Sequence, residues 1–360
     1  MSFAQNRKNT RQISIGDVKI GGFAPVAVQS MTNTFTSDVK ATINQIRHLE
    51  EAGCEIIRVA VPDMDAACAI SRIQKEISIP LIADIHFDHR LAVAAADAGA
   101  DGLRINPGNI GSEKNIKKVV ECAKSCEIPI RIGVNAGSLE KELLKKYDGA
   151  TPEAMVESAF GQINLLKSLD FHDVKISLKA SDVWRTISAY RLMSSKSDIP
   201  LHLGVTEAGT LFSGIAKSSL GIGMLLAEGI GDTFRVSLTR DPVDEIRAAY
   251  EILKALEIRQ RGPEIISCPT CGRCRIDLFN IVEQVELALL NSRKQIKIAI
   301  MGCVVNGPGE AREADIGVAG GDGMGILFKK GKVIKKCPEE KLVDILLEAV
   351  KESEDSLPSP

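Results

Sequence analysis

The sequence predicts an α/β fold, a (βα)8 TIM-type barrel followed by a smaller α+β domain. Eight short β-rich runs alternate with helical patterns over about 235 residues, which is the size of such a barrel. A polar break at residues 259–263, ending in Gly-Pro, separates this repeat from a region that lacks it. A doubly wound open sheet is the alternative, because the repeat alone does not show whether the sheet closes.

The barrel is expected to span residues 1–258 and to begin with a hairpin over 12–23. The eight predicted strands follow in the order Val26–Ser30, Ile56–Ala60, Leu81–Ile85, Leu103–Ile105, Ile130–Val134, Lys175–Lys179, Leu201–Val205 and Phe234–Leu238. Apolar residues at helical spacing between them predict helices such as Ala41–Ala52, Met64–Ile77, Glu153–Leu169 and Pro242–Leu256. Proline precedes several strands, where a helix must stop and the chain must turn.

A linker over 259–264 is expected to lead into a second domain over 265–360. Its elements should be a helix, a strand, a glycine-rich hairpin and a final amphipathic helix, over Ile276–Leu290, Lys297–Met301, Gly317–Lys335 and Glu339–Val350. The last ten residues are polar and are expected to fray.

Composition narrows the class of protein. The formal net charge of -2 argues against a general nucleic-acid binder, which would carry a basic excess. The first ten residues lack the apolar run of a signal peptide, and the longest apolar runs are too short to cross a bilayer. We therefore expect a cytoplasmic protein, neither bound to a membrane nor to nucleic acid, whose nine cysteines are reduced thiols or metal ligands.

Two cysteine-containing windows in the second domain predict a metal site. Cys268 and Cys271 have C-x2-C spacing, and Cys303 lies in a Gly/Pro-rich window that continues through Asn306 to Glu310. Such spacing serves tetrahedral zinc or an iron–sulfur cluster. A zinc ribbon would normally supply a second pair, whereas three thiolates and a harder oxygen ligand suit a cluster with one exchangeable iron. The spacing therefore favours a cluster and leaves zinc open.

Charged residues within or just past the predicted strands predict an anion site. Barrel strands are normally apolar on both faces, so a charge inside one needs a reason. A single such residue is as often half of a core ion pair, but five cations at one mouth exceed the two nearby acids. The set comprises Arg58, Asp84, Arg104, Arg131, Asn135, Lys179, Glu207 and Arg235. Arginine matches phosphate oxygens, so a diphosphate is a fitting ligand, and Glu207 could bind substrate hydroxyls or move a proton.

Cys122 and Cys126 have i, i+4 spacing on a predicted helix. Such a pair could bind a metal ion. Packing as small apolar side chains is the expected state.

Several motifs together resemble the family of bacterial 4-hydroxy-3-methylbut-2-en-1-yl diphosphate synthases, also called IspG or GcpE. They occur in the family's order over nearly the whole chain: Val28–Thr34, Lys179–Asp182, Thr206–Gly209, Glu228–Thr233, Cys268–Cys271 and Gly302–Glu310. The resemblance implies a barrel joined to a [4Fe-4S] domain. The implied activity is reductive ring opening and dehydration of 2-C-methyl-D-erythritol 2,4-cyclodiphosphate in non-mevalonate isoprenoid biosynthesis.

The resemblance also implies roles for residues. The cluster ligands would be Cys268, Cys271, Cys303 and Glu310, with Asn306 beside them and Glu207 near the substrate carbons. The diphosphate would be held by the cationic set, with Asn135 and Asp84 beside it: Arg58, Arg104, Arg131, Lys179 and Arg235. Electrons would come from a flavodoxin or ferredoxin, and the enzyme would be a homodimer.

Two rival functions remain in view. One is a non-redox barrel enzyme with a zinc-stabilised second domain, and the other is an electron-transfer module with a passive barrel. Cys274 extends the first window to C-x2-C-x2-C and could displace Glu310 as fourth ligand, although the intact context of Glu310 disfavours this. A radical S-adenosylmethionine enzyme is disfavoured because no C-x3-C-x2-C lies early in the barrel.

Overall fold

The computed structural model describes residues 6–106, 110–303, 313–321 and 323–353. The chain forms two compact units, residues 1–259 and residues 260–360. The division falls between Arg259 and Gln260. Arg259 belongs to the first unit, because its guanidinium donates to both carboxylate oxygens of Glu55 at 2.8 and 2.9 Å and to the carbonyl of Val26 at 2.7 Å.

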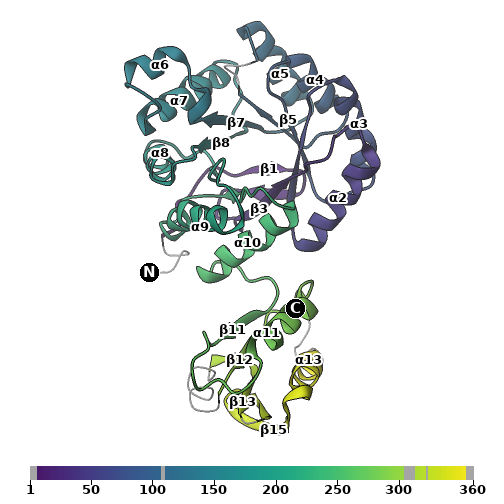
Figure 1. The fold of residues 1–360 in the computed structure, drawn as a ribbon. Helices are drawn as coiled ribbons and strands as arrows, with labels where there is room; N and C mark the ends of the chain where they lie inside the picture. The colour runs from purple at the N-terminus through teal and green to yellow at the C-terminus, as the bar shows by residue number, and fades with distance from the viewer. Residues whose placement is uncertain (1–5, 107–109, 304–312, 322, 354–360) are drawn as a thin grey trace. The chain divides into compact units, whose positions relative to one another are not determined.

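The first unit contains a parallel eight-stranded sheet (Figure 1). Its strands are β3 (Ala27–Met31), β4 (Ile56–Ala60), β5 (Leu81–Asp84), β6 (Gly102–Ile105), β7 (Ile130–Asn135), β8 (Val174–Lys179), β9 (His202–Leu203) and β10 (Thr233–Phe234). Neighbours follow chain order from β3 to β8, and β10 pairs with both β3 and β9. A parallel bridge from Ile176 to Leu201, directly before β9, joins the remaining edges. The sheet is therefore a nearly closed barrel, as predicted, and the open sheet is excluded.

Helices surround the strands (Figure 1). They are α2 (Val39–Ala52), α3 (Met64–Gln74), α4 (His89–Asp97), α5 (Glu113–Ser125), α6 (Lys141–Lys146), α7 (Pro152–Ser168), α8 (Val183–Lys196), α9 (Leu211–Ala227) and α10 (Pro242–Ala255), with a 3-10 turn, η2 (Ala136–Ser138). Aspartates such as Asp63 and Asp182 begin helices by accepting a backbone N–H of the first turn. Within the described ranges, no helix is both long and apolar enough to span a bilayer.

The strand prediction was wrong in length at the end of the barrel. Residues 235–238 were expected in a strand, yet β10 ends at Phe234. The backbone N–H of Leu238 donates to Glu245 of α10 at 3.0 Å, and the Arg235 side chain binds the same carboxylate. The backbone of Leu238 and the side chain of Arg235 therefore bind α10, and residues 235–238 lie outside β10.

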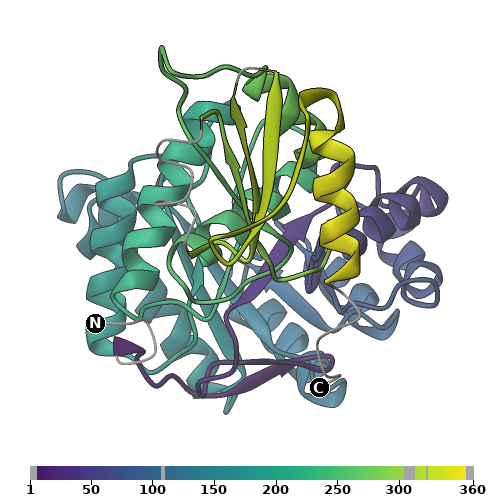
Figure 2. The same cartoon turned by 90° about the horizontal axis from the view of Figure 1, so that it is seen from below.

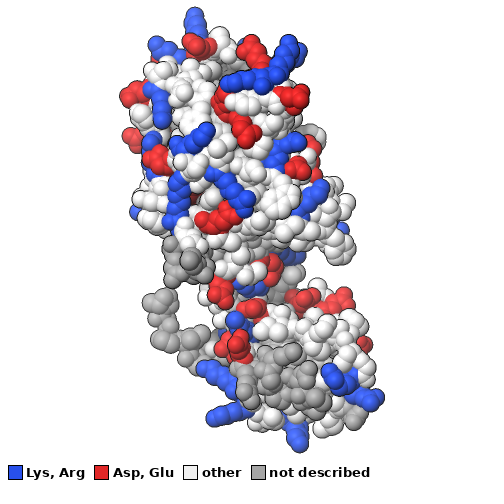
Figure 3. Space-filling model, turned by 90° about the vertical axis from the view of Figure 1, so that its left-hand side faces the viewer, with Lys and Arg blue, Asp and Glu red and all other residues white. Residues whose placement is uncertain are grey.

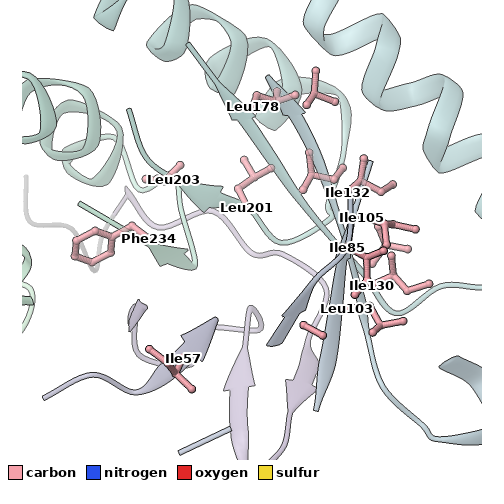
Figure 4. Packing of buried hydrophobic residues seen from close by; sticks show 14 of the residues in the cluster. Ile57, Ile85, Leu103, Ile105, Ile130, Ile132, Leu178, Leu201, Leu203 and Phe234 are labelled. Atoms are coloured by element: carbon pink, nitrogen blue, oxygen red, sulfur yellow. The ribbon is translucent and has the colours of Figure 1, made fainter. Parts of the chain in front are cut away.

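Strand residues alternate between two environments. Leu103 and Ile105 flank Arg104, and Ile130 and Ile132 flank Arg131 (Figure 4). These apolar side chains are buried in the same core as the helices, so the arginines between them face the barrel interior.

The N-terminal hairpin closes one end of that interior. Strands β1 (Ile13–Ile15) and β2 (Val18–Ile20) form an antiparallel pair. Their isoleucines pack with Ala27, Ile56 and Ile82 from the beginnings of three barrel strands. The interior is therefore apolar at the strands' N-terminal end and charged further along.

The second unit contains a five-stranded mixed sheet. Its strands are β11 (Glu264–Ser267), β12 (Lys297–Met301), β13 (Ile316–Gly321), β14 (Met324–Lys329) and β15 (Lys332–Pro338), in that order. The first three are parallel, and β14 and β15 are antiparallel additions. Helices α11 (Leu278–Leu289) and α13 (Leu342–Glu352), the latter preceded by the turn η4 (Glu339–Lys341), share one apolar core with the sheet; Figure 2 shows α13 alongside the strands. The sequence did not predict β11, whose first residue was assigned to the linker.

Candidate functional site

A row of charged residues crosses the barrel interior from β5 to β8. Asp84 is the register partner of Arg104, Arg104 of Arg131, and Arg131 of Lys175. Their exposed fractions are 4%, 5%, 2% and 1%. TIM barrels usually fill this space with branched aliphatic side chains, so a charged row indicates a ligand or a dedicated ion network.

Asp84 organises two arginines in this interior. Its Oδ1 lies 3.1 Å from Nη1 of Arg104, and its Oδ2 lies 3.5 Å from Nη1 of Arg58. Burial by itself would raise the pKa of the Asp84 carboxyl, but Arg58 and Arg104 hold that pKa well below its usual range. Burial lowers the pKa of Arg58 to about 10, although Asp84 opposes the shift. Asp84 is therefore ionised and orients both guanidinium groups.

Within the described part of the chain, Arg131 and Lys175 are buried without a hydrogen-bonded counter-ion. Nε and Nη1 of Arg131 and Nζ of Lys175 have no hydrogen-bond partner among the described residues. Burial lowers the pKa of both side chains well below the usual values, and Arg58 and Arg104 lower that of Arg131 further. An unpaired buried charge costs several kcal/mol. The barrel interior thus carries positive charge that an anion would neutralise.

Lys179 and Arg235 lie further along the strands. Lys179 ends β8 as the register partner of Asn135, and burial followed by Arg131 lowers its pKa well below the usual value. Arg235 makes a two-point contact with Glu245 of α10, with both N–O distances 3.0 Å. The sequence analysis did not include Glu245, which is 2% exposed. Arg235 therefore brings its own counter-ion and adds less free positive charge than its position suggested.

Two glycines make room for the interior cations. A Cβ on Gly133 would lie 2.5 Å from Nε of Arg104, and one on Gly204 would lie 2.7 Å from Nζ of Lys179. No real side chain tolerates such contacts without displacing the cation. The sequence analysis did not single out either glycine, because a glycine inside a strand signals close approach without saying to what.

His202 is a further interior residue that sequence reasoning missed. It is fully buried on β9, its Nδ1 lies 2.8 Å from Oγ1 of Thr233, and its Nε2 has no partner among the described residues. Burial, followed by Arg131 and Lys179, lowers its pKa well below the usual value. His202 is therefore neutral. Both His202 and Lys175 are titratable residues inside otherwise apolar strands, and that pattern could have identified them from the sequence.

Glu207 and Asn135 occupy the C-terminal side of the strands. Glu207 is exposed in the turn that follows β9, and its φ of 52° is left-handed, which is uncommon for a residue other than glycine. Asn135 is half-buried at the end of β7. Active sites of TIM barrels form at this end of the strands. Glu207 lies at this end of the barrel, and its contact with a substrate stays a prediction.

One face of the barrel unit carries charges of both signs, unlike the buried row in the interior. Figure 3 shows Lys and Arg interspersed with Asp and Glu over the face of the barrel unit that it presents. No single-sign field covers that face.

The two cysteine windows meet at the ends of neighbouring parallel strands in the second unit. Ser267 of β11 is the register partner of Ile300 of β12, so Cys268 and the segment leading to Cys303 emerge side by side. The backbone N–H of Gly302 donates to Sγ of Cys268 at 3.3 Å. Hydrogen bonds to sulfur stabilise thiolates and tune iron–sulfur clusters. Asn306 and Glu310 lie outside the described residues.

The thiols of the two windows are not grouped as the ligands of one zinc ion would be. Sγ atoms in a tetrahedral zinc site are about 3.8 Å apart, given a Zn–S distance of about 2.3 Å. The sulfurs of Cys268, Cys271 and Cys303 are not all within 4.8 Å of one another. Three thiols that follow the ends of β11 and β12 are donors of the kind that hold an iron–sulfur cluster.

Cys274 sits against the glycine of the second window. A Cβ on Gly302 would lie 2.5 Å from its Sγ, which also contacts the carbonyl of Ile276 at 3.4 Å. The side chain packs at the border of the second unit's core. Cys268 packs at the same border, so packing does not separate the two thiols, and the exclusion of Cys274 as a ligand stays a prediction.

Comparisons with known proteins bear on the whole chain. The model of the GcpE TIM-barrel domain matches residues 10–250, and that of the GcpE protein C-terminal domain matches residues 264–352. A protein named 4-hydroxy-3-methylbut-2-en-1-yl diphosphate synthase (flavodoxin) from Caldanaerobacter subterraneus is 62% identical over 344 residues, covering 96% of this chain and 97% of that protein. One with the same name from Thermodesulfovibrio yellowstonii is 59% identical and covers 96% and 99%.

Among solved structures, a dihydropteroate synthase from Xanthomonas albilineans is similar at 13% identity, with a TM-score of 0.48, over 69% of this chain and 99% of that one. The assignment rests on the sequence relatives, which match both units in order. The chain belongs to the GcpE family.

Proposed function

We propose that this chain is a 4-hydroxy-3-methylbut-2-en-1-yl diphosphate synthase of the non-mevalonate isoprenoid pathway. Its near full-length relatives carry that name with flavodoxin in parentheses. The observation that carries the proposal is the row of buried, partly unpaired cations inside the barrel. An electron-transfer module whose barrel binds no ligand would not need buried cations there.

The reaction balances as one cyclodiphosphate, two electrons and two protons giving one linear diphosphate and one water. A ring C–O bond breaks, a hydroxyl leaves as water and a C=C bond forms. The negative charge of the diphosphate opposes the addition of electrons nearby, so cations that neutralise it lower the barrier.

Arg131, Lys175 and Lys179 supply that neutralisation in this proposal. Arg131 contributes a buried guanidinium, and a bound diphosphate raises the lowered pKa values of Lys175 and Lys179 and so favours their charged forms. Asp84 acts as a positioning residue that holds Arg58 and Arg104 ready to donate. Arg235, with Glu245 behind it, offers a more fixed contact.

Glu207 and Asn135 are the candidates for contact with the substrate's carbon skeleton and hydroxyls. Glu207 is exposed, so its carboxylate is free to accept hydrogen bonds or to move a proton once the site closes. Its left-handed backbone fits a residue held for function.

Cys268, Cys271 and Cys303 would hold a [4Fe-4S] cluster, with Glu310 as fourth ligand and Asn306 beside it. The cluster supplies single electrons and an iron with an exchangeable position. The Gly302 N–H stabilises the Cys268 thiolate. A carboxylate is a harder and more labile ligand than a thiolate, so Glu310 would leave one iron position exchangeable.

The partners follow from the electron count. A flavodoxin, named in the relatives' titles, or a ferredoxin would deliver electrons one at a time. A homodimer in the cytoplasm completes the proposal. The rival zinc-containing, non-redox barrel enzyme would need neither donor nor iron.

The test is turnover without oxygen. Cluster-loaded protein is incubated with the cyclodiphosphate and reduced flavodoxin, and the linear diphosphate is measured by mass spectrometry. We expect product from the wild type and from Cys68→Ser, whose exposed thiol lies on α3, but neither iron nor product from Cys268→Ser. Glu310→Ala should lose turnover more completely than iron. A colourless zinc protein without turnover would overturn the proposal.

A further inference from the structure

A second group of metal-binding side chains lies on the outside of the barrel, where α4 and α5 end. Asp97 is the last residue of α4, Cys122 lies one turn from the end of α5, and Cys126 caps that helix. One ligand atom from each lies within 4.8 Å of the other two. Among the described residues, no other three His, Cys, Asp or Glu side chains are this close.

The helix geometry fixes the two thiols on one side. The backbone N–H of Cys126 donates to the carbonyl of Cys122 at 3.0 Å, so the pair is one helical turn apart. Sγ of Cys122 lies 3.7 Å from Oδ1 of Asp97. In a tetrahedral zinc site, a sulfur and an oxygen ligand are about 3.6 Å apart, as follows from metal–ligand distances of about 2.3 and 2.1 Å. The separation of Cys122 and Asp97 therefore matches that of two ligands of one tetrahedral ion, and Cys126 lies within 4.8 Å of both.

The electrostatic setting also favours a cation. Both α4 and α5 end here, and the C-terminal end of a helix carries partial negative charge. The carbonyl of Val93 lies 3.9 Å from Sγ of Cys122 and adds a further oxygen. Cys122 and Cys126 are half-buried and Asp97 is exposed, so the group is open to solvent on one side.

The sequence analysis took the two cysteines as packed apolar side chains. They do contact the edge of the core, and the Cys122 thiol also donates to the Asp97 carboxylate of the neighbouring helix, a polar contact that was not expected for packed apolar side chains. Sequence spacing could not reveal Asp97, because it lies 25 residues before Cys122 and only the barrel brings α4 beside α5.

We propose that Asp97, Cys122 and Cys126 bind one thiophilic divalent cation of the zinc type and so link the ends of α4 and α5. Two thiolates select a borderline or soft metal, and a carboxylate with a water molecule completes the coordination. Binding releases the thiol protons to solvent and involves no change of oxidation state. The site is separate from Cys268, Cys271 and Cys303, and its existence does not depend on the proposed function.

The test compares zinc content in full-length, cluster-loaded protein, in which the cluster cysteines are occupied. Wild type, Cys122→Ser/Cys126→Ser, Asp97→Asn and Cys68→Ser are incubated with zinc under reducing conditions, which exclude a disulfide, and then desalted. Metal is measured by mass spectrometry, and affinity by competition with a zinc chelator.

We expect wild type and Cys68→Ser to retain about one more zinc per chain than the double variant. Asp97→Asn should bind zinc at least about 10- to 100-fold more weakly. Loss of a residue that only supports a metal ligand already costs that much, and Asp97 is proposed as a ligand itself. Zinc should raise the unfolding temperature of wild type and of Cys68→Ser but not that of the double variant, because a ligand that binds the folded state stabilises it.

Equal zinc content in wild type and the double variant would overturn the proposal, as would an equal loss in Cys68→Ser. If the double variant fails to fold, Asp97→Asn decides, since its exposed side chain can be replaced without disturbing the core. Iron content and turnover are expected to stay unchanged in all of these variants, which separates this test from that of the proposed function.

Discussion

The barrel interior and the cysteine windows present reactive side chains in different ways. In the barrel, Asp84, Arg104, Arg131 and Lys175 are register partners on paired strands, so the sheet fixes their positions. In the second unit, Cys268 follows the end of a strand and Cys271 is exposed in a loop. The barrel is therefore preorganised for its ligand, whereas loops leave thiolates able to adjust as a metal binds.

The largest effect that would test this contrast is loss of the charge that holds the barrel network. Asp84→Asn leaves Arg58 and Arg104 buried without their counter-ion, which is expected to lower the free energy of unfolding by about 3–5 kcal/mol. Glu76→Gln, which breaks an exposed pair with Arg47, should cost less than about 1 kcal/mol. Denaturant unfolding measures both, and equal losses would contradict a preorganised interior.

The same variant has a pH signature. The folded-state pKa of Asp84 is below its unfolded value of about 3.9, so its stabilisation is present above that pH and disappears as the pH falls toward the folded pKa. Asp84→Asn should therefore flatten the loss of stability below about pH 4. If the free energy of unfolding falls as steeply below about pH 4 in Asp84→Asn as in wild type, other carboxylates cause the loss.

A smaller effect should follow from filling the space beside an interior cation. Gly133→Ala places a Cβ 2.5 Å from Nε of Arg104, and overpacking of this kind costs about 1–3 kcal/mol. Gly137→Ala, in the turn η2 two residues past the end of β7, has nothing within 4 Å of its added Cβ and is the matched control. We expect weaker substrate binding and lower stability for the first variant only, measured by calorimetry and denaturant unfolding.

A substitution in the cysteine windows tests whether their loops adjust more easily than the barrel interior does. Gly302→Ala places a Cβ 2.5 Å from Sγ of Cys274, whereas Gly272→Ala meets nothing within 4 Å. Because a loop can yield, we expect a cost of about 1–2 kcal/mol, which is a factor of about 5–30 in cluster retention against a chelator. Iron content of the two variants checks this, and equal retention would show that the second window has more freedom than its contacts suggest.

Much of the fold was predictable because it rests on local patterns. Alternation of apolar runs and helical faces gave the order of strands and helices, and β12 has its predicted bounds. Strands β9 and β10 were predicted in place but are only two residues long, and β11 was not predicted. After β10, the contact of Leu238 with Glu245 on α10 is one that sequence periodicity does not carry.

The site was predictable where a charge interrupts an apolar strand, as at Arg104 and Arg131. It was not predictable where a partner comes from a distant element: Glu245 reaches Arg235 from α10, and Asp97 reaches Cys122 from α4. Gly133 matters only because Arg104 lies beside it on another strand. Sequence spacing alone does not predict these contacts, because each joins residues on different elements of the fold.

The smallest expected effect is a proton taken up on binding. Lys175 and Lys179 have lowered pKa values in the free protein, and a bound anion raises them again. Binding of the cyclodiphosphate should therefore consume protons and weaken as the pH rises through the free-protein pKa values. Calorimetric titration in two buffers of different ionisation enthalpy measures the uptake; its absence would mean that both lysines stay fully charged without the ligand.

The central claim is that the unpaired cations inside the barrel are the diphosphate site. The most direct measurement is calorimetric titration of the cyclodiphosphate into cluster-loaded wild type, Arg131→Met and the exposed-surface control Arg90→Met. We predict that Arg131→Met binds about 10- to 150-fold more weakly, as loss of a charge-assisted contact of about 1.5–3 kcal/mol implies, while Arg90→Met binds as wild type does. Because replacing an unpaired buried cation by an apolar side chain is neutral or stabilising, Arg131→Met should unfold no earlier than wild type. Unchanged affinity in a folded Arg131→Met protein would contradict the account.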